Sequence, residues 1–595
     1  MKKIAQGNLS FSLNKEDKTA AVIGFEDHED HILIPRSIKY ESDEFIITRI
    51  SKDSFKYSSI KSIDFPPDSG LHVIEKHAFI YSTIESLTIP STVSELKRGW
   101  CAGVTKLNKV LVNKNNPHFK NHNNEIVIGK SDSKSDNFDV LIFANRNIKS
   151  LSIPESVKII GPYSFSCSSI ENISISHHIT NICSKSFYCC QKLKCIEIPI
   201  DSKLQIIEKK AFSCSPIEQI FIPSHVTSIG ENCFFNCNRL QKVEFSKSSE
   251  LQTIEKFAFS KSSIESISIP KKVTSIEEGT FYGCQNLLEV EIPTDSEIRT
   301  IGLKSFAHSS INHITIPIHV NQICEGAFIK CEGLVSVDVP ENSELRMIES
   351  NAFDNSAIER LSIPSSICEL KSGWCAGVPN LKKISVIQNS QKNISSCCDG
   401  KLIVGKTKIE SDVFDVLVFA ERDVKKVTIP SDITKIESYA FSATLIKSIF
   451  IPPQVSEICE GAFFCCKNLS HVAIHPDSKL ATIGDKMFMF STIESFVVPR
   501  NVIKICDDAF AFCSKLQFVE FPIDSQLQVI ENSFARSSIK SIFIPRNVIK
   551  IDEQAFDSCN QLRIIEFDEN INKRIIENIK HGECKRAILM IPPSF

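Results

Sequence analysis

Hydrophobic residues recur along this chain in one phrase, which begins with the pattern L-x-x-V-x-I-P. Apolar positions two and three apart suit a short strand with one buried face, and proline closes the strand because it cannot extend a hydrogen-bond ladder. A turn then leads to V-x-x-I, which predicts a second short strand. A polar pair and Ala-Phe follow, and they predict a single helical or 3₁₀ turn that drives the phenyl ring inward. Each phrase therefore predicts two strands and one turn.

The phenylalanine of this phrase marks a regular period. In the first run its steps alternate between 22 and 25 residues, at Phe165, Phe187, Phe212, Phe234, Phe259, Phe281, Phe306, Phe328 and Phe353. In a second run the steps are 22, 25, 22, 24 and 22 residues, at Phe441, Phe463, Phe488, Phe510, Phe534 and Phe556. Two types of coil alternate: one has serine three residues after phenylalanine, and the other has cysteine there and a longer loop. The repeating unit is a pair of coils of about 47 residues.

No coil can bury its apolar side alone, so neighbouring coils must stack into a solenoid around a continuous core. The recurring I-x-I-P-x-x-V-x-x-I-x-x-x-A-F-x-x-C-x-x-L resembles the BspA-like leucine-rich repeats of bacterial and trichomonad surface antigens, over roughly residues 30–567. This resemblance implies a β-rich solenoid: a right-handed leucine-rich-repeat array with a concave parallel sheet and short helical or 3₁₀ turns.

The pattern divides the chain into seven segments. Residues 1–30 form an N-terminal cap, in which FSLNKEDKTAAVIGF (11–25) is similar to the hairpin cap of that family. Repeats occupy residues 31–112, 148–387 and 424–567, and residues 568–595 form a mixed-charge tail that caps the last coil. Two interruptions, residues 113–147 and 388–423, each contain two strand-like runs that predict a protruding β-hairpin. Insertions in solenoids often lie on the functional face, and the alternative is a spacer without a partner.

Charge and cysteine usage narrow the class of protein. The formal net charge is −3, which gives no pull toward nucleic acid or an anionic membrane. The 23 cysteines include no Cys-x-x-Cys pair, so neither a small disulfide scaffold nor a zinc finger is expected. The N-terminus lacks the apolar segment of a secretory signal, and no stretch approaches ~18 continuous apolar residues. These features indicate a soluble chain in a reducing compartment.

Seven cysteines form a ladder, each three residues after a marker phenylalanine. They are Cys190, Cys237, Cys284, Cys331, Cys466, Cys513 and Cys559. Cysteines in alternate coils lie about 9–10 Å apart, whereas a disulfide needs Cα atoms within ~7 Å. The ladder therefore cannot cross-link itself, and we interpret it as a row of small buried residues that line a turn.

The residue before the last apolar position of each longer strand is expected to point outward. In six of the seven cysteine-type coils it is acidic: Glu197, Glu244, Glu291, Asp338, Glu520 and Glu566. In the serine-type coils it is mostly serine or threonine, but it is apolar at Phe221, Phe450, Val497 and Phe543. We expect an acidic row that gives way to apolar residues toward the C-terminus and that binds a protein partner. Solubility or edge protection is the alternative explanation.

The hexapeptide GWCAGV occurs twice, at residues 99–104 and 373–378, each time just before an interruption. A Trp-Cys pair flanked by glycine resembles a reactive thiol. The repeat register, however, places Cys101 and Cys375 where the marker phenylalanine belongs, and Trp100 and Trp374 where its alanine belongs. Exchanging the sizes of two neighbouring side chains keeps the local volume, so we interpret the motif as a repacked core coil.

No catalytic constellation is visible: the chain has no glycine-rich phosphate loop, H-E-x-x-H or G-x-S-x-G motif, and no cofactor or metal is expected. The adjacent pair His177 and His178 is predicted to lie in an exposed loop rather than to bind a ligand. A non-enzymatic protein-interaction solenoid is the expected function. The family resemblance implies a surface antigen that adheres to host or microbial proteins, whereas the missing signal and the many thiols favour an intracellular scaffold or regulatory protein.

Overall fold

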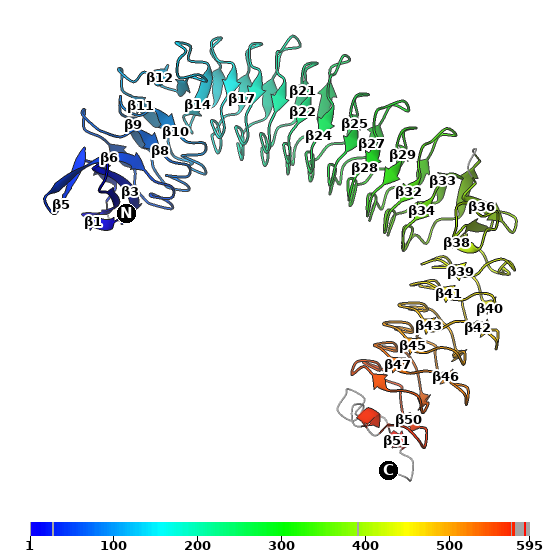
Figure 1. Cartoon of the computed structure of the whole chain (residues 1–595). Coiled ribbons are helices and arrows are strands. Elements are labelled where there is room, and N and C mark those ends of the chain that lie inside the picture. The colour runs from blue at the N-terminus through cyan, green and yellow to red at the C-terminus, as the bar shows by residue number, and fades with distance from the viewer. Residues whose placement is uncertain (1, 27–28, 389–391, 573, 577–587, 591–595) are drawn as a thin grey trace. The chain divides into compact units, whose positions relative to one another are not determined.

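Each phrase of the sequence folds as one coil with two short strands. The computed structural model describes residues 2–26, 29–388, 392–572, 574–576 and 588–590. In a typical coil, β17 (Asn172–Ser174) is followed by a turn and by β18 (Asn181–Ile182). Equivalent strands of successive coils pair in parallel, so the chain is a β-solenoid, as the sequence predicts (Figure 1).

The chain divides into two compact units, residues 1–298 and 299–595. In the first unit the longer strands are β4 (His31–Leu33), β7 (Ser62–Asp64), β9 (Ser86–Ile89), β11 (Lys109–Val112), β15 (Ser150–Ser152), β17, β19 (Cys195–Glu197), β21 (Gln219–Ile222), β23 (Lys242–Phe245), β25 (Ser266–Ser268) and β27 (Glu289–Glu291). The two-residue strands are β8 (Val73–Ile74), β10 (Glu95–Leu96), β16 (Ile159–Ile160), β18, β20 (Ile206–Ile207), β22 (Ser228–Ile229), β24 (Thr253–Ile254) and β26 (Ser275–Ile276). Each kind forms its own parallel ladders.

The second unit repeats this arrangement. Its longer strands are β29 (His313–Thr315), β31 (Ser336–Asp338), β33 (Arg360–Pro364), β35 (Lys383–Ile387), β40 (Ser448–Ile451), β42 (His471–Ile474), β44 (Ser495–Val497), β46 (Phe518–Glu520), β48 (Ser541–Ile544), β50 (Ile564–Phe567) and β51 (Ile588–Met590). Its two-residue strands are β28 (Thr300–Ile301), β30 (Gln322–Ile323), β32 (Met347–Ile348), β34 (Glu369–Leu370), β39 (Lys435–Ile436), β41 (Glu457–Ile458), β43 (Thr482–Ile483), β45 (Lys504–Ile505), β47 (Val529–Ile530) and β49 (Lys550–Ile551). We call the outward side of the longer strands, in either unit, the strand face.

The N-terminal segment is an antiparallel meander of β1 (Lys2–Gln6), β2 (Leu9–Asn14) and β3 (Thr19–Phe25). Strand β3 pairs in parallel with β6 (Asp43–Ile50), which also pairs with β5 (Ser37–Tyr40) and with β8. Alternate residues of β2, namely Leu9, Phe11 and Leu13, are buried. The meander therefore covers the first coil and leads directly into the ladder of two-residue strands. At the other end, Ile571, Ile575 and Ile576 join the core.

The turn around the marker phenylalanine differs from the expected helical or 3₁₀ turn. Residues two before and two after the marker have positive φ, as at Tyr163 (61°) and Cys167 (60°) around Phe165. Their N–H groups and that of Phe165 donate to carbonyls of the next coil, at 3.4, 2.9 and 2.9 Å. The turn thus forms a third inter-coil ladder, whose hydrogen bonds offset the usual penalty of left-handed backbone at non-glycine residues.

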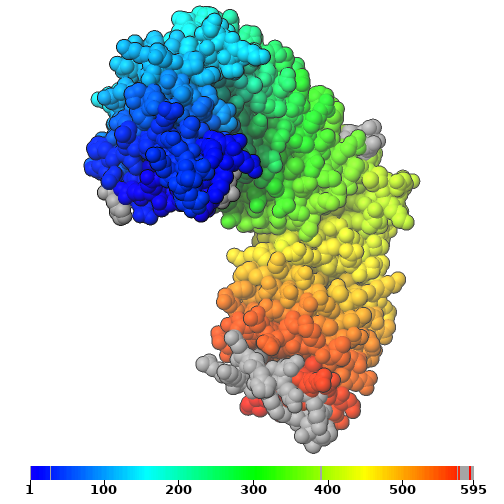
Figure 2. All heavy atoms as spheres, turned by 60° about the vertical axis from the view of Figure 1, so that its left-hand side comes forward, coloured from blue at the N-terminus to red at the C-terminus, as the bar shows by residue number. Residues whose placement is uncertain are grey.

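A column of phenylalanine rings fills the core. Phe187, Phe212 and Phe234 have no exposed surface, and neighbouring ring centroids are 5.2 and 5.4 Å apart with nearly parallel planes. The strand side chains that point inward are valine, isoleucine and leucine, and they complete the interior. Side chains close the space between successive ribbons, so the surface of each unit is continuous (Figure 2).

Each interruption contains three antiparallel strands rather than two. They are β12 (Phe119–His122), β13 (Ile126–Gly129) and β14 (Val140–Ala144) in the first unit, and β36 (Ile394–Cys397), β37 (Leu402–Gly405) and β38 (Val416–Ala420) in the second. The third strand pairs in parallel with the next two-residue strand, β16 or β39. The expected protruding hairpin is therefore anchored in the solenoid by its last strand.

Candidate functional site

The strand face presents the six predicted acids in register with the preceding coil. In the first unit Glu197, Glu244 and Glu291 are exposed and stand beside Ser174, Phe221 and Ser268 of the neighbouring strands. In the second unit Asp338, Glu520 and Glu566 are exposed and stand beside Thr315, Val497 and Phe543. The acidic residues that alternate with hydroxyl or apolar residues in the sequence thus form a row of exposed side chains on each unit.

The partners of these acids are few and exposed. Glu244 is ion-paired with Lys242 of the same strand, Glu291 accepts a hydrogen bond from Ser268 Oγ at 2.5 Å, and Asp338 lies 3.8 Å from His313. Exposed pairs of this kind stabilise a fold by about 0–1 kcal/mol. The acidic row therefore contributes little to stability.

Toward the C-terminus the strand face becomes apolar. Phe450, Val497 and Phe543 are 52%, 57% and 37% exposed, while Phe221 in the first unit is half-buried. A groove of about 340 Å³ runs over β46, β48 and β50, between Phe518 and Phe543. Phe518 occupies the other outward position of its strand and was not among the residues predicted for this face. The sequence F-V-E of β46 could have predicted this, because the first and third residues of a three-residue strand point to the same face.

A cavity of about 310 Å³ lies at the second interruption, between β34 and β36–β39. Its lining includes the apolar residues Trp374, Ile394 and Val416 and the charged residues Lys406 and Lys435. Ligand pockets combine apolar walls and a few polar groups in this way. Sequence analysis did not predict a cavity here.

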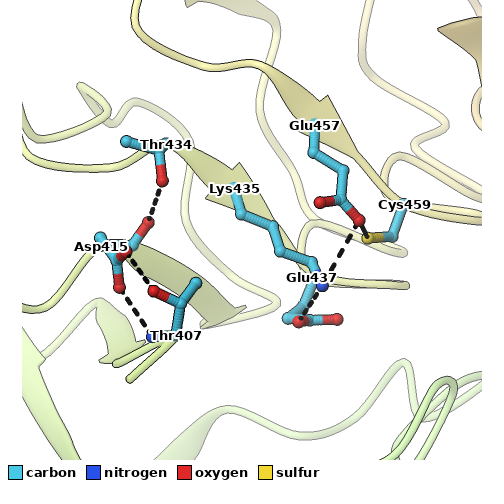
Figure 3. Close-up of polar contacts among 7 residues, drawn as sticks. All are labelled: Thr407, Asp415, Thr434, Lys435, Glu437, Glu457 and Cys459. Atoms are coloured by element: carbon cyan, nitrogen blue, oxygen red, sulfur yellow. Dashed lines mark hydrogen bonds and ion pairs between the residues drawn. The ribbon is translucent and has the colours of Figure 1, made fainter. Parts of the chain in front are cut away.

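Three of the lining residues, Thr407, Lys435 and Glu437, take part in polar contacts beside the cavity (Figure 3). Asp415 accepts hydrogen bonds from the N–H and Oγ1 of Thr407 at 2.8 and 2.6 Å. Burial opposes ionisation, but these hydrogen bonds hold the pKa of Asp415 below its usual value. Lys435 is ion-paired with Glu437 at 3.0 Å and with Glu457 at 3.4 Å. The side chains of Thr407, Lys435 and Glu437 are therefore each held by a hydrogen bond or an ion pair.

The side chain at one register position differs between the two interruptions. In the first, Phe119 pairs with Gly129 and its ring lies against that glycine. In the second, the smaller Ile394 occupies the same position beside Gly405 and lines the cavity. The hydrogen bonds of Thr407 to Asp415 recur between Ser131 and Asp139. The turn is thus common to both copies. The copies differ in the size of the side chain beside the glycine, which is Phe119 in the first and Ile394 in the second.

The GWCAGV motif lies in the core, as predicted. Trp100 continues the aromatic column: its ring is 6.0 Å from Phe79 and 5.8 Å from Phe143 of β14. Trp374 links Phe353 to Phe419 of β38 in the same way, at 6.5 and 6.3 Å. The displaced indole therefore connects the coil before the interruption to the strand that resumes the array.

A buried arginine beside each motif cysteine was missed by sequence analysis. Arg146 is 1% exposed, and its guanidinium donates to the carbonyls of Val104, Ala144, Ser164 and Tyr163 at 2.7 to 3.4 Å. Its Nη2 is also 3.4 Å from Cys101 Sγ, and the group lies over the Phe143 ring. Arg422 repeats these contacts with Cys375 and Phe419. The signal in the sequence was an arginine two residues after each of the repeated segments DVLIFA and DVLVFA.

These contacts argue against a nucleophilic thiol. Burial raises the pKa of the Cys101 thiol, and it raises that of Cys375 to about 11, although Arg422 acts in the opposite direction. A reactive cysteine needs a depressed pKa and access to solvent. Both thiols are buried and protonated at neutral pH, and they serve as packing partners of the guanidinium.

The pKa values and burial predict the order of thiol modification. At pH 8 an aromatic disulfide reagent should react within minutes with the exposed Cys368 and Cys398 of the native chain, because only an accessible thiolate attacks. Cys101 and Cys375 should react only after unfolding. Mass spectrometry of peptides after timed quenching measures both classes. Rapid labelling of Cys101 or Cys375 in the folded chain would contradict the assignment of these thiols to the core.

The ladder cysteines line a turn, as predicted. Each donates its S–H to the backbone carbonyl of the marker phenylalanine in the preceding coil, for example Cys190 to Phe165 at 3.0 Å and Cys284 to Phe259 at 3.1 Å. All are buried except Cys559, which is partly buried, and no disulfide joins any of the 22 cysteines in the described residues. The ladder is thus a row of small hydrogen-bonded core residues.

Among the described residues, no helix has the length and apolar character that crossing a membrane requires.

Comparison with known proteins gives one family. The model of the BspA type leucine-rich repeat region matches residues 36–125, 115–213, 136–252, 205–318, 252–382, 299–416, 407–532 and 481–581. No curated protein matches the sequence. Among solved structures, a leucine-rich repeat protein of Bacteroides ovatus is 16% identical, with 99% of each chain covered and a TM-score of 0.35. A leucine-rich cell surface protein of Faecalibacterium prausnitzii is 19% identical over 96% of this chain and 95% of its own, with a TM-score of 0.25. The pneumococcal vaccine antigen PcpA is 14% identical over 99% and 98%, with a TM-score of 0.29.

Proposed function

This chain belongs to the family of BspA-type leucine-rich-repeat proteins, and we propose on this basis that its strand face binds a protein partner in adhesion at a cell surface. The observation that carries the proposal is the acidic row. Glu197, Glu244 and Glu291 are exposed and occur in every second coil, and the side-chain contacts of Glu244 with Lys242 and of Glu291 with Ser268 are exposed as well.

The geometry supports recognition of a basic or mixed partner surface. Alternate coils place the acids about 10 Å apart, and the neighbouring positions carry small hydroxyls or an aromatic ring. Charges spaced in this way steer association and select among partners more than they add to affinity. The apolar groove between Phe518 and Phe543 supplies, in the second unit, the kind of desolvated contact that carries binding energy.

Neutralising the row tests the binding role. The combined variant Glu197→Gln, Glu244→Gln and Glu291→Gln should weaken binding to an immobilised panel of extracellular-matrix glycoproteins at least about five-fold, mainly through the association rate. A matched control changes three exposed loop acids of the same unit, Glu250→Gln, Asp295→Asn and Glu297→Gln. Surface plasmon resonance at two salt concentrations measures both. If the two triple variants bound equally well, the proposal that the strand face binds the partner would be wrong.

Location separates adhesion from an intracellular scaffold. An antibody against this chain should label intact cells as strongly as permeabilised ones if the chain acts at the surface. Labelling that appears only after permeabilisation would reject the adhesion role and favour the scaffold, whatever the result with the acidic row.

A further inference from the structure

In the first unit, three side chains of types that can ligate metals converge at the loops between the longer and the two-residue strands. His177 and His178 lie in the loop between β17 and β18, and Glu155 lies in the loop between β15 and β16 of the preceding coil. One ligand atom from each residue lies within 4.8 Å of the other two. His178 Nε2 is 3.4 Å from Glu155 Oε2, and the two imidazole centroids are 3.9 Å apart.

Neighbouring groups orient these side chains. Ser176 Oγ donates to Glu155 Oε2 at 3.2 Å and accepts a hydrogen bond from the backbone N–H of His178 at the same distance. The carbonyl of His177 accepts a hydrogen bond from the backbone N–H of Lys203 at 2.9 Å, which ties the loop to the next coil. Outer contacts of this kind set the direction of ligands in metal sites.

We propose that Glu155, His177 and His178 form a binding site for a divalent transition metal, with Zn²⁺ as the best match. Two imidazole nitrogens and one carboxylate oxygen suit zinc, whereas Ca²⁺ and Mg²⁺ prefer oxygen ligands alone. The residues are partly exposed, with Glu155 at 74% and His178 at 38% of the side chain. Such a site keeps a coordination position for water or for a ligand atom of a partner protein. The metal would also join two adjacent coils.

The next pair of coils provides a natural comparison. His225 stands 47 residues after His178, at the same position of its loop, but Ser224 occupies the place of His177. In the coil before it, Ile200 follows Pro199 where Glu155 follows Pro154. The loop of His225 therefore presents a single histidine, and the residue after the proline of the preceding coil is isoleucine instead of glutamate.

Zinc titration of the full chain tests the site. Exposed thiols are first alkylated under native conditions, so that cysteine does not compete, and ZnCl₂ binding is followed by calorimetry. The double variant His177→Ala and His178→Ala should bind one zinc equivalent fewer than the unaltered chain, and Glu155→Gln should weaken that equivalent at least ten-fold. His225→Ala should bind like the unaltered chain. Because the three side chains are exposed or partly so, all variants should keep the metal-free melting temperature.

Two results would overturn the proposal: equal zinc binding by the unaltered chain and the double variant, or an equal loss in His225→Ala. Cobalt substitution supplies an independent measurement. Nitrogen and oxygen ligands should give only weak visible bands that disappear in the double variant. Intense thiolate charge-transfer bands that persist in the double variant would place the metal on cysteine and reject the site.

Discussion

Replacing Arg146 by alanine should lower the free energy of unfolding of the surrounding coils by about 3–5 kcal/mol, because several buried carbonyls lose their donor at about 1–3 kcal/mol each. The guanidinium donates to four backbone carbonyls. One belongs to Val104 of the GWCAGV coil, one to Ala144 at the end of β14, and two to Tyr163 and Ser164 of the next coil. Its removal leaves buried oxygens without these donors and opens a cavity beside Phe143. The loss should appear as a lower urea midpoint of the transition that includes the first interruption.

Two further variants separate hydrogen bonding from packing. Arg146→Met keeps much of the volume and should recover only part of the loss, because the carbonyls remain unpaired. Arg239→Ala removes an exposed arginine of the same unit and should change stability by less than about 0.5 kcal/mol. If Arg146→Ala were as stable as Arg239→Ala, the buried arginine would have no part in joining the interruption to the array.

Replacing Phe212 by alanine should destabilise its coils by about 3–5 kcal/mol, the usual effect of emptying a core site of a phenyl ring. The ring is fully buried between Phe187 and Phe234, with both neighbours stacked on it. Because each coil contacts only its neighbours, the effect should be local and should raise amide hydrogen exchange most in the adjacent coils. Hydrogen exchange followed by mass spectrometry measures the extent of the change.

The strand face supplies the matched control. Phe450→Ala removes a ring that is 52% exposed, and it should change stability by well under 1 kcal/mol. Phe212→Leu fills most of the site and should cost less than the alanine variant. An effect of Phe212→Ala no larger than that of Phe450→Ala would mean that the column of rings does not carry the stability of the coil.

Much of the candidate surface was predictable. The outward placement of Glu197 and Glu520 follows from the two-residue period of a strand once its buried residues are known. The burial of the ladder cysteines follows from their fixed distance to the marker phenylalanine. By contrast, the recess at Ile394 depends on the side chain that faces Gly405 across an antiparallel pair, and the interruptions have no period from which that pairing can be inferred.

The sequence by itself determined the solenoid, its alternating coils, the inward and outward residues of each strand, and the core position of GWCAGV, because these features repeat in a fixed local register. Only the tertiary structure decided the left-handed turn ladder, the burial of Arg146 and Arg422, and the meeting of Glu155 with His177 and His178. Each of these depends on hydrogen bonds or proximity between coils that are about 20 or more residues apart in the chain. The hydrophobic pattern predicts that coils stack, but it does not predict which polar groups of neighbouring coils lie close together in the stack.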